Sequence, residues 1–199
     1  IVFGLVGSEM CIRDRLSLME YSQKNSVPLL ARGGGSSQCG QTVGESVVLD
    51  YSKHQNKILE LNVEEKYVWV QPGVVLDHLN AYLKPHGLWF PVDVSTSSRA
   101  TIGGMSANNS CGSRSLYYGN MVHNVLAIEA ILDDGSIFNF DQINKNYLAT
   151  KNNQDRLYKI IDKFIDVRQQ VGGEIDANWP TTQRRVGGYN IDLIDPEGF

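Results

Sequence analysis

The residues best suited to chemistry form the run Arg32-Gly33-Gly34-Gly35-Ser36-Ser37, which follows the apolar run 28–31. Glycine has no Cβ and tolerates positive φ, so successive backbone N–H groups can point at one anion. The Arg32 guanidinium and the two serine hydroxyls add further donors. The run therefore predicts a phosphate-binding loop, and the alternative is a glycine-rich surface turn that binds no ligand.

The surroundings of this loop exclude two common phosphate sites. A P-loop needs Gly-Lys-Ser/Thr, and the sequence has no lysine between Lys24 and Lys53. A Rossmann fingerprint needs glycines that open a helix, whereas the β-branched run 46–51 predicts a second strand. The expected order is strand, glycine loop, strand, which disfavours a nucleoside triphosphatase and a dinucleotide-binding Rossmann unit.

A second segment, residues 89–112, is also rich in glycine and small hydroxyl residues, and Tyr117-Tyr118-Gly119 follows it. It has too few large apolar side chains to pack a core of its own, so we expect an irregular loop. Long ordered loops in compact domains are usually functional. We therefore expect a ligand to organise this segment.

In order and spacing, the two segments resemble the FAD-binding domain of the vanillyl-alcohol oxidase and p-cresol methylhydroxylase (PCMH) superfamily. The family pattern is Arg-Gly-Gly-Gly-Thr-Ser, then Pro-x-Asp-x-Ser, Ala-Thr-Ile-Gly-Gly-Met, Ala-Asn-Asn-Ser-Cys-Gly and Tyr-Gly. The version in this chain is most similar to the FAD-linked 2-hydroxyacid dehydrogenases, the group that holds glycolate oxidase and the D-lactate and D-2-hydroxyglutarate dehydrogenases. The resemblance spans about residues 20–195 and implies an α+β PCMH-type fold, with two α/β subdomains and FAD in the cleft between them.

The resemblance also implies which residues bind FAD. Residues 32–37 would hold the pyrophosphate, and Pro91, Asp93, Ser95 and Thr96 would line the second wall of the cofactor site. Residues 101–104 would pass close to the diphosphate and ribityl chain, and residues 107–112 would approach the isoalloxazine. A long, doubly charged ligand needs backbone donors and close backbone approach, so a β-branched residue at Gly34 should block FAD and spare the fold. The implied ligands are Arg32, Gly33, Gly34, Gly35, Ser36, Ser37, Gln41 (bracing the first loop), Pro91, Asp93, Ser95, Thr96, Thr101, Ile102, Gly103, Gly104, Ala107, Asn108, Ser110, Cys111 and Gly112.

The attachment of the flavin follows from one departure from the family pattern. Members with a covalent flavin place a histidine in the first loop, whereas this chain has Ser36 and Ser37, and its first histidine is His54. We therefore predict noncovalent, dissociable FAD.

The activity implied by the resemblance is FAD-dependent oxidation of a CH–OH group. A 2-hydroxy acid would lose the hydroxyl proton while a hydride passes from C2 to flavin N5, and an electron acceptor would reoxidise the flavin. Arg184, Arg185 and Tyr189 are candidates for the substrate wall, with a structural role as the alternative. Another oxidase activity of the superfamily (on alditols, aldonolactones or phenols) and a flavin-binding subunit without turnover remain as alternatives.

Hydrophobic periodicity predicts the elements that position these segments. The expected elements are a hairpin over 58–63 and 67–70, a helix over 75–83 that stops at Pro85-His86-Gly87, a hairpin over 124–132 and 136–140 about Asp133-Asp134-Gly135, and an amphipathic helix over 154–171 that Gly172-Gly173 ends.

Composition sets further bounds. The 199 residues, 42% of them hydrophobic, can bury one core or two small lobes that share a cleft. A balance of 18 basic against 22 acidic residues offers no electrostatic footprint for nucleic acid, and no apolar run approaches the roughly 18 residues of a membrane span. Three cysteines, Cys11, Cys39 and Cys111, without a Cys-x-x-Cys pair favour a reducing, cytoplasmic compartment and no metal site.

The ends of the sequence lead to two expectations about domain organisation. Residues 1–15 resemble translated sequencing-adapter sequence, so we expect a non-native leader there and the FAD-binding domain over 16–199; a signal peptide is the competing interpretation. The chain stops at Phe199, before the Gly-Ser-Glu-Gly-Thr-Leu-Gly segment of the family. We therefore expect a fragment, inactive alone, whose substrate domain with the catalytic base and any metal ligands lies beyond Phe199.

Overall fold

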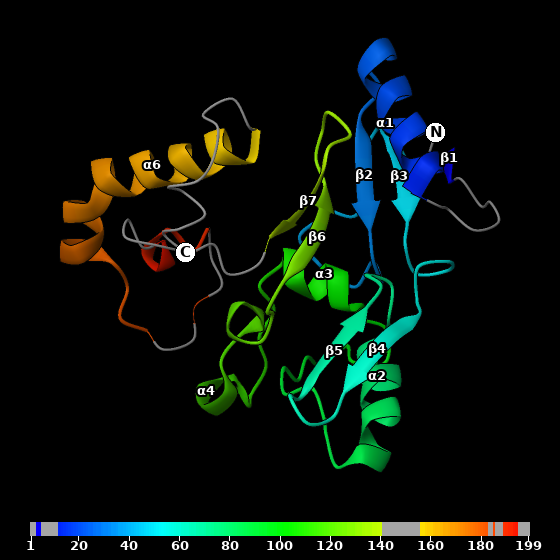
Figure 1. Ribbon diagram of the computed structural model, residues 1–199, viewed down its shortest axis with the longest axis vertical. Helices are drawn as coiled ribbons and strands as arrows, with labels where there is room; N and C mark the ends of the chain where they lie inside the picture. Colours follow the sequence, from blue (N-terminus) through cyan, green and yellow to red (C-terminus); the bar gives the residue numbers. More distant parts are fainter. Residues whose placement is uncertain (1–2, 5–11, 141–155, 183–184, 186–188, 195–199) are drawn as a thin grey trace. The chain divides into compact units, whose positions relative to one another are not determined.

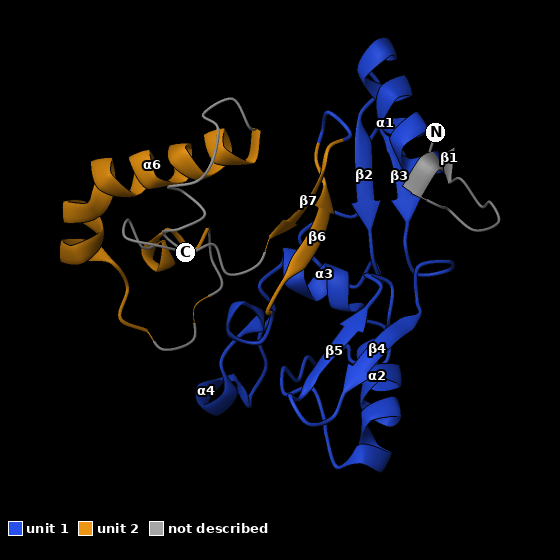
Figure 2. Ribbon diagram, in the orientation of Figure 1, with its two compact units in different colours: residues 1–125, 133–135 blue, residues 126–132, 136–199 orange. Residues whose placement is uncertain are grey.

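The chain forms two compact units in the computed structural model, which describes residues 3–4, 12–140, 156–182, 185 and 189–194 (Figures 1 and 2). Unit 1 comprises Ile1–Val125 and Asp133–Gly135, and unit 2 comprises Leu126–Leu132 and Ser136–Phe199. Each unit contains both helices and strands, which confirms the expected α+β class.

A small parallel sheet lies at the start of unit 1. Its strands β1 (Phe3–Gly4), β2 (Leu29–Arg32) and β3 (Val47–Asp50) have the order β1-β3-β2, with Leu29 opposite Val47 and Arg32 opposite Asp50. Parallel strands are usually joined through a helix, but here the loop 33–46 makes the connection. The predicted order of strand, glycine loop and strand is confirmed.

The helix α1 (Ile12–Asn25) precedes β2 and packs in unit 1. It begins before residue 15, so the boundary expected for a non-native leader falls inside a helix rather than between elements. In the part of the chain that is described, no helix is both long enough and apolar enough to cross a bilayer.

The first predicted hairpin and the helix after it are both present. Strands β4 (Ile58–Asn62) and β5 (Tyr67–Val70) pair antiparallel, and α2 (Leu76–Leu83) follows. The helix ends in the 3-10 turn η1 (Lys84–His86), where Gly87 takes the left-handed φ of 69°. Its inner face packs on the hairpin in a cluster that consists of Val74, Leu79 and Leu83 with Ile58, Leu61, Val68, Val70, Leu88, Phe90 and Ile102.

The segment 89–112 is less irregular than expected. It contains the helix α3 (Ile102–Ala107), and α4 (Ser115–Tyr118) and η2 (Met121–His123) come after it. Three of its side chains are buried in one cluster with residues from either side along the chain: Leu76, Val92, Ala100, Met105 and Met121. Most of the segment is irregular, as expected, but α3 is a departure from that expectation, and protein packing orders part of the segment.

Unit 2 contains the second hairpin and the long helix. Strands β6 (Ile128–Ile131) and β7 (Ile137–Phe140) pair antiparallel across the predicted turn, in which the Leu132 N–H donates to the Ser136 carbonyl at 2.8 Å. The helix α6 (Arg156–Asn178) buries Leu157 and Ile161 against Phe138, Phe140 and Ile165, and η3 (Ile191–Leu193) lies near the end of the chain.

The helix α6 continues through Gly172-Gly173, so the prediction that these glycines end it was wrong. Ile175, only 6% exposed, lies on the far side of the glycines, and Arg168 reaches across them to Asp176 with an Nη2–Oδ1 distance of 3.3 Å. Burial and an ion pair beyond the glycines outweigh the roughly 1 kcal/mol that each glycine costs a helix relative to alanine.

Replacing Gly173 with alanine should stabilise α6. A Cβ at this position would meet no heavy atom within 4 Å, and alanine removes the backbone entropy cost of glycine, which is about 0.5–1 kcal/mol. Urea denaturation should show this gain in the free energy of unfolding. In the matched variant Gly172→Ala the Cβ would lie 2.8 Å from Arg168 Nη1, so a smaller gain is expected; a less stable Gly173→Ala would contradict the helix interior assignment.

Candidate functional site

The two glycine-rich segments, more than 50 residues apart in the sequence, pack directly on each other in unit 1. A Cβ on Gly33 would overlap the Thr101 hydroxyl, and a Cβ on Gly34 would overlap the Arg99 carbonyl oxygen and lie 3.0 Å from its carbon. A second tie joins the segments farther along, where Gln41 Nε2 donates to Asn108 Oδ1 at 3.5 Å. The backbones can approach this closely only because residues 33 and 34 have no side chain.

The first loop presents unused hydrogen-bond donors. Within the described part of the chain, the backbone N–H groups of residues 33–37 donate to no protein acceptor. The guanidinium of Arg32 lies over Gly35, where the φ is 63° and an added Cβ would stand 2.6 Å from Nη2. Consecutive free N–H groups beside a guanidinium form an arrangement that suits an anion with several oxygens.

Thr101 holds the second segment in place. It is 1% exposed, caps α3 and accepts a hydrogen bond on Oγ1 from the Gly104 N–H at 3.4 Å. The Gly103 N–H donates to the Pro72 carbonyl at 2.8 Å, and a Cβ on Gly103 would lie 2.9 Å from Pro72 Cα. Pro72, a few residues before the start of α2 at Leu76, thus forms part of the surface on which α3 packs.

Asp93 binds the chain 20 residues farther on. Its Oδ1 accepts from the Arg114 N–H at 2.9 Å, its Oδ2 accepts from the Ser113 hydroxyl at 2.8 Å, and Arg114 Nε lies 3.8 Å from Oδ2. Partial burial acts to raise the pKa of Asp93, but the two hydrogen bonds and the Arg114 charge outweigh it, so the pKa lies below its ordinary value. The carboxylate therefore stays charged at neutral pH and holds residues 113 and 114.

An aromatic cluster adjoins this carboxylate. The Arg114 guanidinium carbon lies 5.0 Å from the centroid of the Trp89 ring, and Trp89 meets Tyr118 edge to face at 5.1 Å. Tyr118 in turn meets Tyr117, which is 85% exposed, at 4.8 Å. Contacts of these kinds each contribute about 0.5–1.5 kcal/mol, so they link the start of the second segment to α4.

All twenty residues that the sequence assigned to the cofactor lie in unit 1. Thr101 is buried. The partly buried members are Gly33, Gly34, Gly35, Ser37, Pro91, Asp93, Ile102, Gly103, Ser110, Cys111 and Gly112, and the exposed members are Arg32, Ser36, Gln41, Ser95, Thr96, Gly104, Ala107 and Asn108. The structure joins the set through the contacts of Gly33, Gly34, Gln41 and Asp93. The sequence did not reveal the roles of Pro72, Arg99 and Arg114. Each of them contacts a residue far away in the sequence, and no local sequence pattern marks such a contact.

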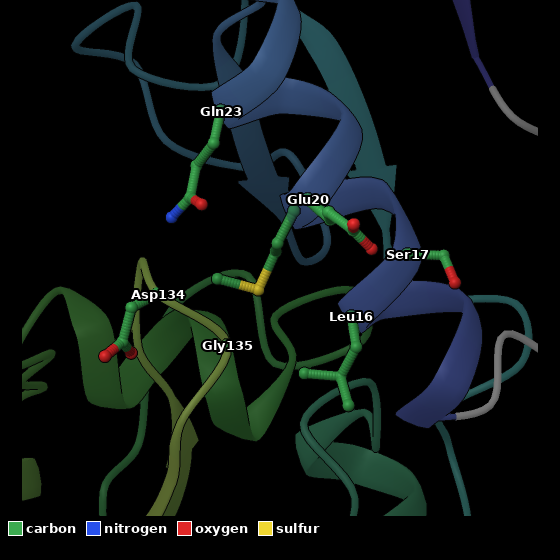
Figure 3. Close-up of a pocket in the computed structure, with 7 residues that line it drawn as sticks. Leu16, Ser17, Glu20, Gln23, Asp134 and Gly135 are labelled. Carbon is green, nitrogen blue, oxygen red and sulfur yellow. The ribbon is translucent and has the colours of Figure 1, made fainter.

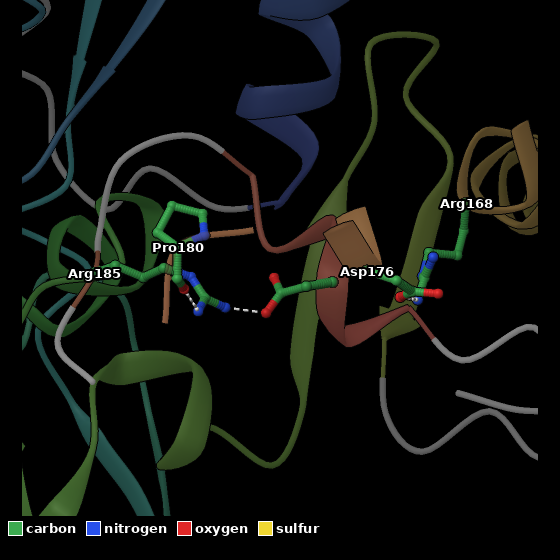
Figure 4. A network of polar contacts seen from close by, with 5 residues as sticks. Arg168, Asp176, Pro180 and Arg185 are labelled. Carbon is green, nitrogen blue, oxygen red and sulfur yellow. Dashed lines mark hydrogen bonds and ion pairs between the residues drawn. The ribbon is translucent and has the colours of Figure 1, made fainter. Parts of the chain in front are cut away.

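The proposed substrate wall belongs to unit 2. Arg184 lies outside the described residues, and Tyr189 is 87% exposed. The Arg185 guanidinium contacts Asp192 and donates to the Pro180 carbonyl at 3.0 Å (Figure 4). It also lies 5.2 Å from the Trp179 ring centroid. These contacts support the structural alternative for Arg185.

A cavity of about 360 Å³ lies between α1 and the turn 133–135 (Figure 3). Its lining residues are Leu16, Ser17, Met19, Glu20, Gln23, Asp134 and Gly135. Gln23 donates to the carbonyl of Asp133 beside it. None of the lining residues belongs to either glycine-rich segment, so this cavity is separate from the candidate site.

Comparison with known families decides what kind of site this is. Residues 12–141 match the FAD binding domain family. The chain belongs to this family. The match includes both glycine-rich segments and every residue of the candidate site, and it confirms the resemblance to FAD-linked oxidases.

Several curated proteins are similar in sequence to this FAD-binding domain. It is 45% identical over 185 residues to a D-2-hydroxyglutarate dehydrogenase of Haemophilus influenzae, covering 89% of the chain and 17% of that protein. It is 35% identical over 195 residues to the enzyme of the same name from Escherichia coli, covering 96% of the chain and 19% of that protein. Glycolate oxidase subunit GlcD of Bacillus subtilis is 37% identical over 127 residues, with coverages of 62% and 27%. The chain thus spans less than a third of the length of each.

Two solved structures have a fold similar to that of this FAD-binding domain. 6-Hydroxy-D-nicotine oxidase from Arthrobacter nicotinovorans superposes with a TM-score of 0.60 at 15% identity, covering 71% of this chain and 32% of that one. Alkyldihydroxyacetonephosphate synthase superposes with a TM-score of 0.56 at 22% identity, covering 65% and 24%. These matches confirm the expected PCMH-type fold.

Proposed function

We propose that this chain binds FAD noncovalently through residues 32–37 and 91–112 of unit 1. The observation that carries the proposal is the set of free backbone N–H groups at 33–37, which lies beside the Arg32 guanidinium and against residues 99–104. A pyrophosphate carries two negative charges and several acceptor oxygens, and these donors suit it. The residues therefore fit the cofactor that the family implies.

The proposal covers the individual ligands and the type of attachment. Residues 33–37 and Arg32 would bind the pyrophosphate, Gln41 would brace the loop through Asn108, and residues 107–112 would border the flavin ring. Serines occupy positions 36 and 37, where covalent members of the superfamily have a histidine, and a serine hydroxyl supplies a hydrogen-bond donor in place of an attachment point. We therefore expect FAD to leave the chain when the chain unfolds.

For the longer protein that such a domain serves, we propose FAD-dependent oxidation of a 2-hydroxy acid. The support is the similarity to proteins named D-2-hydroxyglutarate dehydrogenase and D-lactate dehydrogenase. Bound FAD would supply the hydride acceptor, flavin N5, while the residues of this chain bind and orient it. A small 2-hydroxy acid and an electron acceptor are the proposed partners, and free Cys39 and Cys111 suit a reducing, cytoplasmic compartment.

The test begins with the purified full chain, shown to be folded and monodisperse. After denaturation, chromatography and fluorescence of the supernatant should find FAD in near-stoichiometric amount, with no flavin left on the polypeptide. Riboflavin, which lacks the pyrophosphate, should bind the apo chain at least about a hundredfold more weakly, since charged hydrogen bonds to several oxygens are lost. A folded chain that carries no flavin and cannot be reconstituted would contradict the proposal.

The oxidation itself is tested on the full-length protein. Addition of D-2-hydroxyglutarate or D-lactate should bleach the flavin absorbance anaerobically, and an artificial electron acceptor should restore it. If the protein retains FAD and neither acid reduces the flavin, the proposed substrate class is contradicted, while the proposal of FAD binding stands.

A further inference from the structure

The carboxylate of Asp93 has two partners on the segment 112–115, although the sequence placed it on the wall of the cofactor site. Both of its oxygens accept hydrogen bonds there, from the Ser113 hydroxyl at 2.8 Å and the Arg114 N–H at 2.9 Å. Its side chain is 30% exposed. Because both oxygens already accept hydrogen bonds from the protein, the carboxylate fixes the position of residues 113 and 114.

The segment that Asp93 holds is fixed at several further points. The Gly112 N–H donates to Ser115 Oγ at 3.0 Å, the Ser115 N–H returns a bond to the Gly112 carbonyl at 3.1 Å, and Ser115 is 2% exposed. Just before it, the Ser110 N–H donates to the Met105 carbonyl at 2.9 Å, and the Ser110 carbonyl accepts from Met121 at 3.1 Å. Residues 110–115 therefore form a turn that several hydrogen bonds hold in place, and Asp93 contacts this turn at residues 112–114.

The backbone of Asp93 also sets the position of this turn. A Cβ on Gly112 would overlap the Asp93 carbonyl oxygen, so the two backbones are in direct contact. Arg114 extends the link, because its guanidinium lies over Trp89, four residues before Asp93. Contacts from the carbonyl, the carboxylate and the ring of Trp89 all converge on residues 112–114.

We propose that Asp93 is a positioning residue of the FAD site, which holds residues 110–115 in their bound conformation before the cofactor arrives. This inference rests on the proposed function, because residues 110–112 are proposed to border the flavin. A preformed wall lowers the ordering cost of binding. Asp93 thus contributes to FAD affinity through the residues 112–114 that it holds.

The test compares Asp93→Ala and Asp93→Asn with the wild-type full chain and with Asp166→Ala, which removes an exposed aspartate of α6 in unit 2. Hydrogen exchange of the apo chain should become faster in peptides that cover 110–118 and stay unchanged in β2, β3 and α6. FAD should bind Asp93→Ala about tenfold more weakly. Asp93→Asn keeps one acceptor oxygen and should show a smaller loss, and Asp166→Ala should match the wild type in both measurements.

Each contrary result has a definite meaning. Unchanged hydrogen exchange over 110–118 in Asp93→Ala would overturn the inference that Asp93 holds residues 110–115. Faster exchange with unchanged FAD affinity would overturn the inference that this hold contributes to FAD binding. A wild-type chain that binds no FAD would overturn the proposed function and the cofactor part of this inference together. In that case the exchange comparison, made without ligand, still decides whether Asp93 holds the turn.

The pH dependence supplies an independent readout. The folded pKa of Asp93 lies below its ordinary value, and Arg114 is the charged group that faces it. The stabilisation is therefore present above the ordinary carboxyl pKa of about 3.9 and is lost as the pH falls through the folded pKa. Asparagine does not titrate, so the difference in unfolding free energy between the wild type and Asp93→Asn should be constant near neutral pH and shrink below about pH 4. A difference that stays constant to pH 2 would contradict the inference that the charged carboxylate holds residues 113 and 114.

Discussion

Gly34→Val should abolish FAD retention and lower the melting temperature of the chain at the same time. Even a bare Cβ at position 34 would overlap the Arg99 carbonyl oxygen and lie 3.6 Å from Ala100 Cα. Backbone atoms move less readily than side chains, so the loop 33–37 would have to leave residues 99–101. The sequence predicted that the fold would survive this substitution, because it attributed the need for glycine to the cofactor alone; the structure attributes it to protein packing as well.

The expected cost of Gly34→Val lies near the upper end of the roughly 1–3 kcal/mol that over-packing causes. For a chain of this length that corresponds to a fall of several degrees in melting temperature. The matched control is Gly44→Val in the same loop, since a Cβ there would meet only Ser46 Oγ, at 3.8 Å. The control should retain FAD and stability, and a Gly34→Val variant that also retains both would contradict the observed contact between the two segments.

Gly112→Ala should be the most damaging single methyl addition in the site. The added carbon would overlap the Asp93 carbonyl oxygen and collide with its carboxylate, so Asp93 would lose the Ser113 and Arg114 bonds together. We expect a loss at or above about 3 kcal/mol, which differential scanning calorimetry would record as a fall of about 6–12 °C in melting temperature. FAD retention should be lost with it.

The control for Gly112→Ala is Ser113→Ala, which removes one hydrogen bond to Asp93 without adding atoms. A single hydrogen bond of this kind contributes about 1–2 kcal/mol, so Ser113→Ala should melt several degrees higher than Gly112→Ala. Equal melting temperatures for Gly112→Ala and the wild type would show that residues 112 and 93 are not in contact in solution.

Much of the fold follows from short-range patterns in the sequence. Alternating apolar residues marked β4 and β5, the Asp133-Asp134-Gly135 turn marked the hairpin of β6 and β7, and Pro85-His86-Gly87 marked the end of α2. Each of these signals acts within a few residues, because it depends on local backbone conformation and on which face of one element is apolar. The FAD family could be predicted for a similar reason, since its phosphate loop and its second segment are continuous runs of residues.

The errors occurred where a distant residue reverses a local preference. Gly172 and Gly173 have the composition of a helix end, yet Ile175 and the Arg168–Asp176 pair continue the helix past them. Residues 89–112 look too poor in apolar side chains for a core, yet Val92, Ala100 and Met105 find Leu76 and Met121. Packing energy gained with partners elsewhere in the chain exceeded the local cost in both cases.

By itself, the sequence determined that the chain is an α+β FAD-binding domain and which two segments carry its site. Only the tertiary structure decided that those segments pack on each other through Gly33 and Gly34, and that Asp93 holds residues 112–114. The reason is physical: glycine-rich loops and strand patterns are local properties of a chain, whereas a contact between a missing Cβ and a distant carbonyl exists only after the chain has folded. The same glycines therefore serve both the cofactor and the protein.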